Sequence, residues 1–253
     1  MNKYADFANV YDILTKNIDY SAIIERITKL VPKELCKGGQ ILDLGCGTAS
    51  LSLKLSKLGY DVIAVDASEE MLSVAREKTD DILYICQDLS CLDLYGTAKA
   101  AVCTMDTVNH IESTDKIKEF FKRLSLFLEM DSYFIFDMNT PYKHKKVLAD
   151  NVFTYETDEV YCIWQNEYEK EEKRTHILLD FFVLNDDGCY DRSYDEFYEY
   201  EYDIETICNL LNDTGFDIEG IFDEYSDNQP TEESQRVSII AKKSRLIDSG
   251  EIK

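Results

Sequence analysis

Proline and glycine, the residues that dominate collagenous and low-complexity chains, are scarce in this 253-residue sequence. It contains 3 Pro and 10 Gly, too few for a collagenous or low-complexity segment. No run approaches the roughly 20 consecutive apolar residues of a membrane-spanning helix, and the first residues do not resemble a signal peptide. Hydrophobic residues make up 45% of the chain and charged residues 30%. This composition predicts a folded, cytoplasmic protein with one large domain, or one domain that carries an insertion.

Metal-binding patterns are also missing. The eight cysteines form no C-x-x-C pair and most lie in apolar runs, so we expect buried, reduced thiols. The three histidines, His110, His144 and His176, do not lie at metal-ligand spacing from a cysteine. We therefore expect no metal site.

Positive charge is scarce as well. The chain has 27 Lys and Arg against 50 Asp and Glu, which gives a formal net charge of −23. Proteins that bind nucleic acid need clustered cations to neutralise phosphates, whereas the densest basic runs here, residues 143–146 and 242–243, are short. The same repulsion disfavours anionic membranes. We expect neither nucleic acid nor a membrane as a partner.

Apolar periodicity predicts alternating strands and helices over much of the chain. Two amphipathic helices are expected before the first strand, and a further helix, over 204–212, after a change of pattern at about residue 150. The expected strands cover residues 40–44, 60–65, 82–86, 100–105, 133–137, 216–225 and 237–241, and helices begin near Ser50, Ser68 and Asp115. The alternation is typical of the α/β class, with a doubly wound, mostly parallel, seven-stranded Rossmann-like sheet and helices on both faces.

Between about residues 152 and 202 the apolar pattern has period two. It predicts a three-stranded antiparallel insertion after the fifth strand, with hairpin turns at 169–173 and 185–188. We therefore divide the chain into a core of residues 1–149, an insertion of residues 150–202, and residues 203–253, which return to the core sheet and form a tail. Because additions to a shared scaffold often carry function, the insertion is expected to be a substrate cap or the interface of a homodimer.

A glycine-rich motif, Asp43-Leu44-Gly45-Cys46-Gly47, follows the first strand. Such a turn lets backbone amides and a helix start approach a ligand. The dinucleotide fingerprint G-x-G-x-x-G would need glycine at the position of Ser50. In addition, the Asp43 carboxylate would repel a negatively charged pyrophosphate. The motif therefore points away from a nicotinamide cofactor. It suits a ligand that lacks phosphate and carries cationic groups.

With these residues the chain resembles the class I S-adenosylmethionine-dependent methyltransferases over roughly residues 41–137. Asp43, Gly45 and Gly47 match the family's first motif, and Ala49 replaces a frequent third glycine. The resemblance implies S-adenosylmethionine as the cofactor, with Asp66 accepting the ribose hydroxyls and Asp88 holding the adenine amino group. It extends the cofactor-binding set to Tyr11, Met71, Leu89 and Met105, with Tyr11 at the methionine carboxylate and Met71 against the adenine.

Several of these assignments have a structural alternative. Asp66 and Asp88 are also typical helix-capping residues, and Met71 is typical of core packing. The N-terminal aromatic residues Tyr4, Phe7 and Tyr11 resemble a helix that closes over the cofactor in small-molecule members of the family. Their spacing is equally that of an amphipathic helix packed on the sheet.

His110 follows the fourth strand, at the edge where open α/β sheets bind ligands. An imidazole changes its charge near neutral pH and can serve as a general base. The resemblance supports this role, since a similarly placed histidine occurs in amino-sugar N-methyltransferases. The alternative is a capping or partly buried histidine between Val108 and Ile111.

These observations lead us to expect a methyltransferase that acts on a small-molecule amine or hydroxyl. The first alternative is methylation of a protein or peptide, since an acidic insertion attracts basic chains. The second is a non-catalytic S-adenosylmethionine-binding protein, which polar groups near the strand ends, His110 among them, disfavour. A nicotinamide oxidoreductase comes last.

Overall fold

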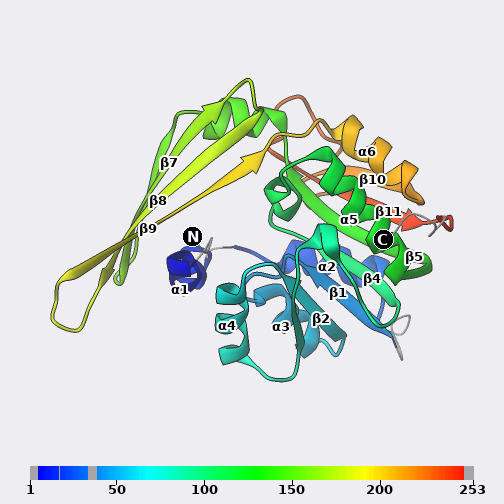
Figure 1. Cartoon of the computed structure of the whole chain (residues 1–253), viewed down its shortest axis with the longest axis horizontal. Helices are drawn as coiled ribbons and strands as arrows, with labels where there is room; N and C mark the ends of the chain where they lie inside the picture. The colour runs from blue at the N-terminus through cyan, green and yellow to red at the C-terminus, as the bar shows by residue number, and fades with distance from the viewer. Residues whose placement is uncertain (1–4, 17, 34–38, 248–253) are drawn as a thin grey trace.

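A seven-stranded sheet forms the centre of the molecule, in the order β10-β11-β5-β4-β1-β2-β3 (Figure 1). The structure is a computed structural model that describes residues 5–16, 18–33 and 39–247. The strands of this sheet are β1 (Gln40–Leu44), β2 (Asp61–Asp66), β3 (Leu83–Cys86), β4 (Ala98–Cys103), β5 (Leu128–Asn139), β10 (Phe216–Asp223) and β11 (Arg236–Lys243). Strands β1 to β5 pair in parallel, and β11 is antiparallel to both β5 and β10. The predicted mostly parallel, doubly wound sheet is confirmed.

Helices and short helical turns connect these strands. They are α1 (Ala5–Leu14), α2 (Ser21–Leu30), α3 (Ser50–Lys57), α4 (Glu69–Lys78), α5 (Thr114–Phe127) and α6 (Ile204–Asp213), with the 3₁₀ turns η1 (Leu89–Cys91) and η2 (Thr107–His110) and the π-helix η3 (Lys143–Leu148). The Ser68 hydroxyl accepts a hydrogen bond from the Met71 amide at 3.1 Å, and the Ser113 hydroxyl accepts one from the Lys116 amide at 3.2 Å. These side-chain caps fix where α4 and α5 begin.

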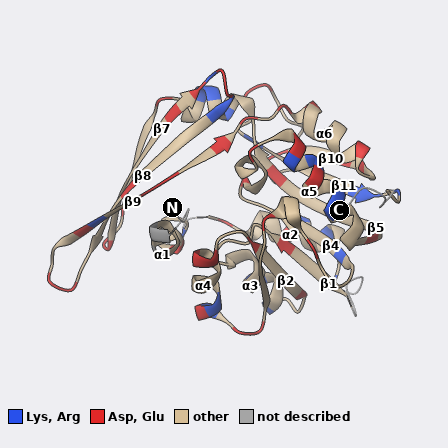
Figure 2. Cartoon of the chain, viewed as in Figure 1, with Lys and Arg blue, Asp and Glu red and all other residues tan. Residues whose placement is uncertain are grey.

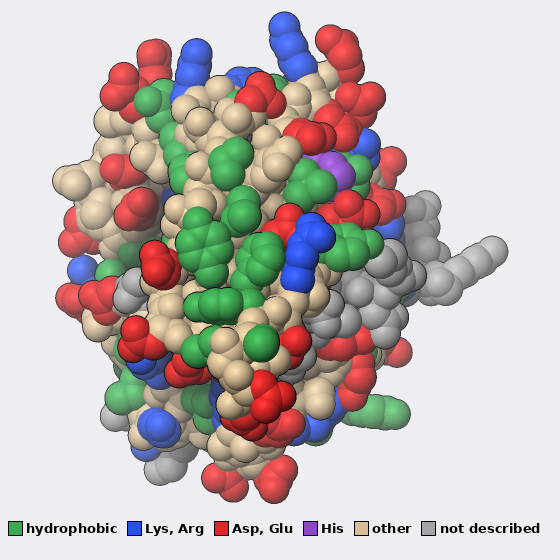
Figure 3. Space-filling model, turned by 90° about the vertical axis from the view of Figure 1, so that its left-hand side faces the viewer, with side chains coloured by type: hydrophobic (Ala, Val, Ile, Leu, Met, Phe, Trp, Pro, Cys, Tyr) green, Lys and Arg blue, Asp and Glu red, His purple; other side chains and the backbone are tan. Residues whose placement is uncertain are grey.

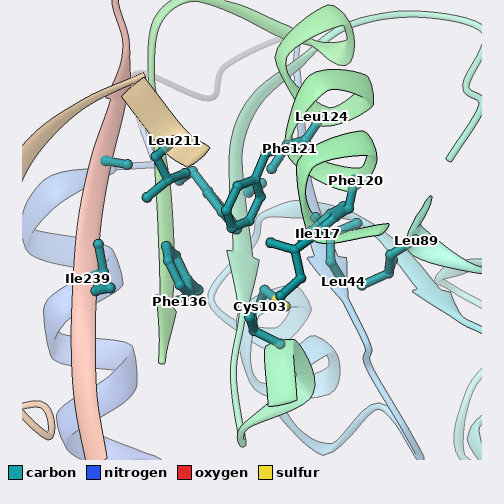
Figure 4. Packing of buried hydrophobic residues seen from close by; sticks show 14 of the residues in the cluster. Leu44, Leu89, Cys103, Ile117, Phe120, Phe121, Leu124, Phe136, Leu211 and Ile239 are labelled. Atoms are coloured by element: carbon teal, nitrogen blue, oxygen red, sulfur yellow. The ribbon is translucent and has the colours of Figure 1, made fainter. Parts of the chain in front are cut away.

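The two faces of the sheet bury separate apolar clusters. Successive side chains of a strand point to opposite faces, so Ile41 packs in the cluster of α2 and α3, whereas Leu42 packs in the cluster of α5 and α6. In the second cluster the rings of Phe134 and Phe136 stack at 4.7 Å. Phe136 lies in this cluster with Phe120 and Phe121 of α5 (Figure 4). Burial of each such ring stabilises the fold by about 1.5–3 kcal/mol. These clusters hold the strand ends rigidly in place.

A second, antiparallel sheet extends away from the core, in the order β6-β7-β8-β9 (Figure 1). Its strands are β6 (Val152–Glu156), β7 (Val160–Glu169), β8 (Arg174–Leu184) and β9 (Tyr190–Tyr200). The prediction of three strands is wrong, because β6 adds a fourth. Strand β6 is a short edge strand in which Phe153 alone is half-buried, so its sequence carries no clear alternation. We call this four-stranded sheet the inserted sheet.

Helix α1 contacts both the core and the inserted sheet. Its Phe7 ring stacks on Phe181 at 5.8 Å and on Phe197 at 5.9 Å. On the other side the Asp12 carboxylate accepts a hydrogen bond from the Thr48 hydroxyl at 2.6 Å and forms an ion pair with Lys78. The helix therefore joins the two parts of the molecule. The predicted contact of Tyr4 lies outside the described residues.

Charge and cysteine placement complete the picture. Acidic side chains are spread over both the core and the inserted sheet (Figure 2). Cys103 and Cys162 are buried, but Cys86, Cys91 and Cys189 are exposed, so the expectation of buried thiols is wrong for these three. They lie at a strand end, in a short helical turn and after a hairpin turn, where side chains reach solvent. In the described part of the chain, no helix is long and apolar enough to cross a membrane.

Candidate active site

A pocket of about 750 Å³ lies at the carboxyl ends of β1, β2 and β4, next to α1 and the inserted sheet. This is where an open α/β sheet reverses its strand order and binds ligands. The pocket brings together all ten residues predicted from sequence: Tyr11, Asp43, Gly45, Gly47, Asp66, Met71, Asp88, Leu89, Met105 and His110. They come from positions scattered over a hundred residues of sequence, so their convergence is a property of the fold.

The glycine loop after β1 has a conformation that needs glycine. Gly45 has a φ of 71° and Gly47 a φ of 53°, both in the left-handed region. A Cβ atom at Gly45 would lie 2.2 Å from the Thr107 Cγ2 atom, whereas one at Gly47 would have the Tyr11 ring 4.0 Å away. The loop therefore packs closely against η2 and leaves its other side open to the pocket, as a bound cofactor requires.

Asp43 is a buried carboxylate at the end of β1. Its Oδ2 atom accepts a hydrogen bond from the Ser52 hydroxyl at 2.5 Å. Burial raises the pKa of Asp43 to about 6, and the neighbouring Asp66 carboxylate acts in the same direction. A positive group bound in the pocket would therefore stabilise ionised Asp43. This fits the sulfonium and ammonium groups of S-adenosylmethionine better than it fits a pyrophosphate.

Asp66 ends β2, and the backbone fixes its carboxylate. The Gly47 amide donates to Oδ2 at 2.7 Å and the Ser68 amide donates to Oδ1 at 2.9 Å. A carboxylate has about four lone-pair sites, so these two bonds leave room for ligand hydroxyls. Burial raises the pKa of Asp66, while the two amides oppose that rise. Helix α4 takes its cap from Ser68, so Asp66 is not the capping residue.

The side chains after β3 combine structural and pocket-lining positions. Asp88 caps η1, because its Oδ1 atom accepts hydrogen bonds from the Ser90 amide at 2.8 Å and the Ser90 hydroxyl at 2.7 Å. The capping alternative is therefore present for Asp88, although the residue also lines the pocket. Leu89 of η1 and Met71 of the preceding helix α4 are both mostly buried, and both line the pocket.

The backbone after β4 is strained where it borders the pocket. Met105 has a φ of 58° and Asp106 a φ of 55°, left-handed values that cost about 1–3 kcal/mol each for such residues. The fully buried Asp137 carboxylate accepts hydrogen bonds from both amides, at 2.8 Å and 2.7 Å. Tyr225 donates to the same carboxylate at 2.5 Å. Asp137 was predicted only as a strand end, and nothing in its local sequence identifies this role.

Arg236 of β11 compensates two of the carboxylates. It donates to Asp137 at 2.7 Å and to Asp106 at 2.8 Å. Burial opposes ionisation of Asp106, but Arg236 and Lys143 outweigh it and hold the pKa of Asp106 below its usual range. The Asn139 amide nitrogen donates to Asp106 at 2.7 Å and to Glu199 at 2.8 Å. A network from four chain segments, namely the turn after β4, β5, β9 and β11, thus borders one end of the pocket.

The end of the pocket next to the inserted sheet contains His110. Its ring centroid lies 5.3 Å from that of Phe197 on β9. Glu199 on the same strand is buried and lines the pocket, and Trp164 of β7 does so as well. Glu199 is not among the site residues predicted from sequence, since it lies in a tyrosine-rich and acidic run. Its neighbour Tyr198 stacks on His176 at 4.5 Å and does not line the pocket.

No group of three or more His, Cys, Asp or Glu side chains among residues 5–16, 18–33 and 39–247 is arranged to hold a metal ion. The polar groups of the pocket can bind hydroxyls, amines and a cationic cofactor, and His110 can exchange a proton with a bound molecule. The pocket is therefore equipped for group transfer by positioning and proton removal.

Comparison with known proteins identifies the family. The family described as "Methyltransferase domain" matches residues 41–130. YqeM of Bacillus subtilis (strain 168), whose name describes a methyltransferase, is 31% identical over 251 residues, covering 97% of this chain and 99% of that protein. The crystal structure of an S-adenosylmethionine-dependent methyltransferase from Clostridium acetobutylicum ATCC 824 is 31% identical, with a TM-score of 0.81, and the match covers 96% of this chain and 99% of that chain.

An amino pentose methyltransferase from Micromonospora echinaspora, CalS10, shares the fold. Its structure with bound S-adenosylmethionine has a TM-score of 0.72 at 15% identity, over 94% of this chain and 97% of that chain. The resemblance found in the strand-end motifs is thereby confirmed. The chain belongs to the S-adenosylmethionine-dependent methyltransferases of class I.

Proposed function

We propose that this methyltransferase transfers the methyl group to a small molecule, at an amine or hydroxyl. The observation that carries the proposal is the set of side chains that line the pocket. Its lining continues from the glycine loop to the aromatic side chains of α1 and the inserted sheet, including Phe7, Trp164 and Phe197. A lining formed on several sides by aromatic side chains suits a compact acceptor.

In this proposal the two ends of the pocket have different tasks. The glycine loop, Asp66 and Asp88 hold the nucleoside part of the cofactor, with Asp66 on the ribose hydroxyls and Asp88 near the adenine. Tyr11 faces the methionine part, and burial raises its pKa, so the phenol stays a neutral hydrogen-bond donor. When bound, S-adenosylmethionine supplies an electrophilic methyl group on a sulfonium sulfur.

His110 is the proposed catalytic base. The acceptor nitrogen or oxygen forms a bond to the methyl carbon as the carbon–sulfur bond breaks, and the electron pair of that bond stays on sulfur. The acceptor then has one proton too many, which the His110 imidazole accepts. His110 ends η2, the turn that follows Met105 and Asp106, whose amides bond to Asp137, and it lines the pocket beside Phe197 of the inserted sheet. Alignment of this kind is the main contribution an enzyme makes to an in-line displacement.

The alternative function, methylation of a protein or peptide, is supported by the charge of the outer surface. Seen from the side of the inserted sheet, acidic side chains surround grouped apolar ones (Figure 3). Such a face attracts basic peptides. A homodimer through the inserted sheet and a cytoplasmic location also stay predictions.

An acceptor screen separates these functions. Calorimetric titration first measures the affinity for S-adenosylmethionine, and S-adenosylhomocysteine release is then measured with small amines, small alcohols and basic peptides. We expect release with a small molecule. Turnover confined to peptides would replace the proposal with the first alternative, and binding without turnover on any acceptor would favour the non-catalytic one.

A further inference from the structure

Two buried glutamates, Glu199 near the end of β9 and Glu201 just after it, differ in how their charge is compensated. The Glu201 carboxylate forms an ion pair with Lys145 at 2.7 Å and accepts the Tyr168 hydroxyl at 2.6 Å. Glu199 is also buried, with 4% of its surface exposed, but within the described ranges it forms no ion pair with a Lys or Arg. The hydrogen bond that Glu199 accepts from Asn139 comes from a neutral amide. Glu199 lines the pocket and Glu201 does not.

The surroundings of Glu199 favour a positive ligand group. Asp106, the nearby carboxylate, is already paired with Arg236. The walls on this side carry aromatic rings, including Phe197, Trp164 and Tyr155. A cation is attracted to aromatic faces, and a buried carboxylate without a cationic partner is costly until one is supplied. An ammonium group satisfies both conditions, whereas a hydroxyl satisfies neither fully. For an amine bound in this form, the His110 imidazole takes one ammonium proton before the nitrogen attacks the methyl carbon, and the methylated amine leaves as an ammonium.

We propose that Glu199 is the residue that selects an amine acceptor, by accepting a hydrogen bond from the acceptor's N–H group at the end of the pocket that contains His110. The inference rests on the proposed function, because it concerns the acceptor of the same pocket. The inference narrows the substrate class from amines and alcohols to amines whose carbon skeleton packs against aromatic side chains.

The electrostatics of the site agree with this assignment. Burial and the Asp106 carboxylate raise the pKa of Glu199, while His110, Lys143 and the Asn139 amide oppose that rise. Burial and the Asp106 carboxylate therefore destabilise the ionised form of Glu199. A positive group placed against the carboxylate stabilises that form, so binding of an amine is coupled to ionisation of Glu199.

The chain offers a direct optical test of this binding. Trp164 is the only tryptophan of the sequence and lines the pocket, so its fluorescence reports occupancy of the acceptor end. The protein saturated with S-adenosylhomocysteine is titrated with benzylamine and with benzyl alcohol, two probes that differ in the amine alone. We expect benzylamine to bind about tenfold more tightly, the difference between a charged and a neutral hydrogen bond.

Matched variants assign the preference to one side chain. Glu199→Gln keeps the size and the Asn139 contact, and it should remove the preference for benzylamine while leaving the affinity for benzyl alcohol unchanged. Glu201→Gln, the buried control outside the pocket, should keep the preference. If Glu199→Gln does not fold, Glu199→Asp is used, which should reduce the preference because the shorter carboxylate withdraws from the amine.

The outcomes separate the inference from the function on which it rests. Failure of the wild-type protein to bind S-adenosylhomocysteine in calorimetry contradicts the proposed function. Normal S-adenosylhomocysteine binding with equal affinity for the two probes overturns the inference alone. So does an undiminished preference for benzylamine in Glu199→Gln or, where that variant does not fold, in Glu199→Asp.

Discussion

The two ends of the pocket are built in different ways. In our proposal, loops that directly follow β1, β2 and β3, within residues 43–89, hold the nucleoside part of the cofactor, and Tyr11 and Met105 complete the cofactor end. The proposed acceptor end combines α1, η2, the inserted sheet and β11, and includes Phe7, Glu199 and Arg236. Most of the cofactor end is thus a local property of strand-loop-helix units, whereas the acceptor end depends on the packing of distant segments.

The largest effect is expected at the most crowded point of the cofactor end. Gly45→Val places a Cβ atom 2.2 Å from Thr107 and forces a β-branched residue into a left-handed backbone conformation. We expect no measurable S-adenosylmethionine binding in calorimetry and a lower melting temperature. Gly96→Ala is the control, because nothing lies within 4 Å of its Cβ position. Retained affinity in Gly45→Val would show that the loop does not define the cofactor end.

The acceptor end is tested by His110→Asn. Removal of a general base typically lowers the rate about 10²–10⁴-fold. We expect such a loss in turnover, measured as S-adenosylhomocysteine release on the acceptor found in the screen, with unchanged cofactor affinity. A lower melting temperature at normal turnover would instead support the structural alternative for His110.

Asp66→Ala tests the cofactor end by a smaller change. Loss of two hydroxyl hydrogen bonds to a charged acceptor should weaken S-adenosylmethionine binding by about 2–4 kcal/mol. The variant also leaves the Gly47 and Ser68 amides without their carboxylate partner, so the melting temperature should fall slightly. Asp61→Ala, at the exposed start of β2, serves as the control. Equal affinities in the two variants would contradict the ribose assignment.

The smallest effect concerns stability and pH. Because the pKa of Asp43 is raised to about 6, the folded protein retains a proton that the unfolded chain releases near pH 4. The unfolding free energy therefore falls as pH rises through this window, and its slope is negative. Asp43→Asn can still accept the Ser52 hydroxyl and removes the ionisation. We expect it to be more stable than the wild type by about 2–3 kcal/mol above pH 6.

The gain from Asp43→Asn should shrink as pH falls toward 4, where the unfolded carboxyl is about half protonated, and should vanish below that pH, because the wild-type carboxyl is then protonated in both states. Denaturant unfolding without cofactor at pH 4, 5, 6 and 7 measures it. A difference that does not change with pH would mean that Asp43 ionises normally in the folded protein.

The sequence predicted the sheet well, and the residues that it named for the cofactor converge on one pocket, because both signals are local. Gly45 and Gly47 lie next to the strand they follow, and Asp66 ends another strand, so period and spacing are enough to place them. Glu199 and Asp137 carry no such signal. Their positions follow from pairing between segments far apart in the chain, such as β9 beside η2. The edge strand β6 was missed for a related reason, since an exposed strand needs no apolar alternation.

Crystallisation with S-adenosylhomocysteine tests the central claim most directly, namely that one pocket has a local cofactor end and an acceptor end assembled from distant segments. The account predicts ribose hydroxyls on Asp66, adenine beside Asp88 and Leu89, and the sulfur directed toward His110 and Glu199. A ligand bound elsewhere, or one whose sulfur points away from His110, would contradict it.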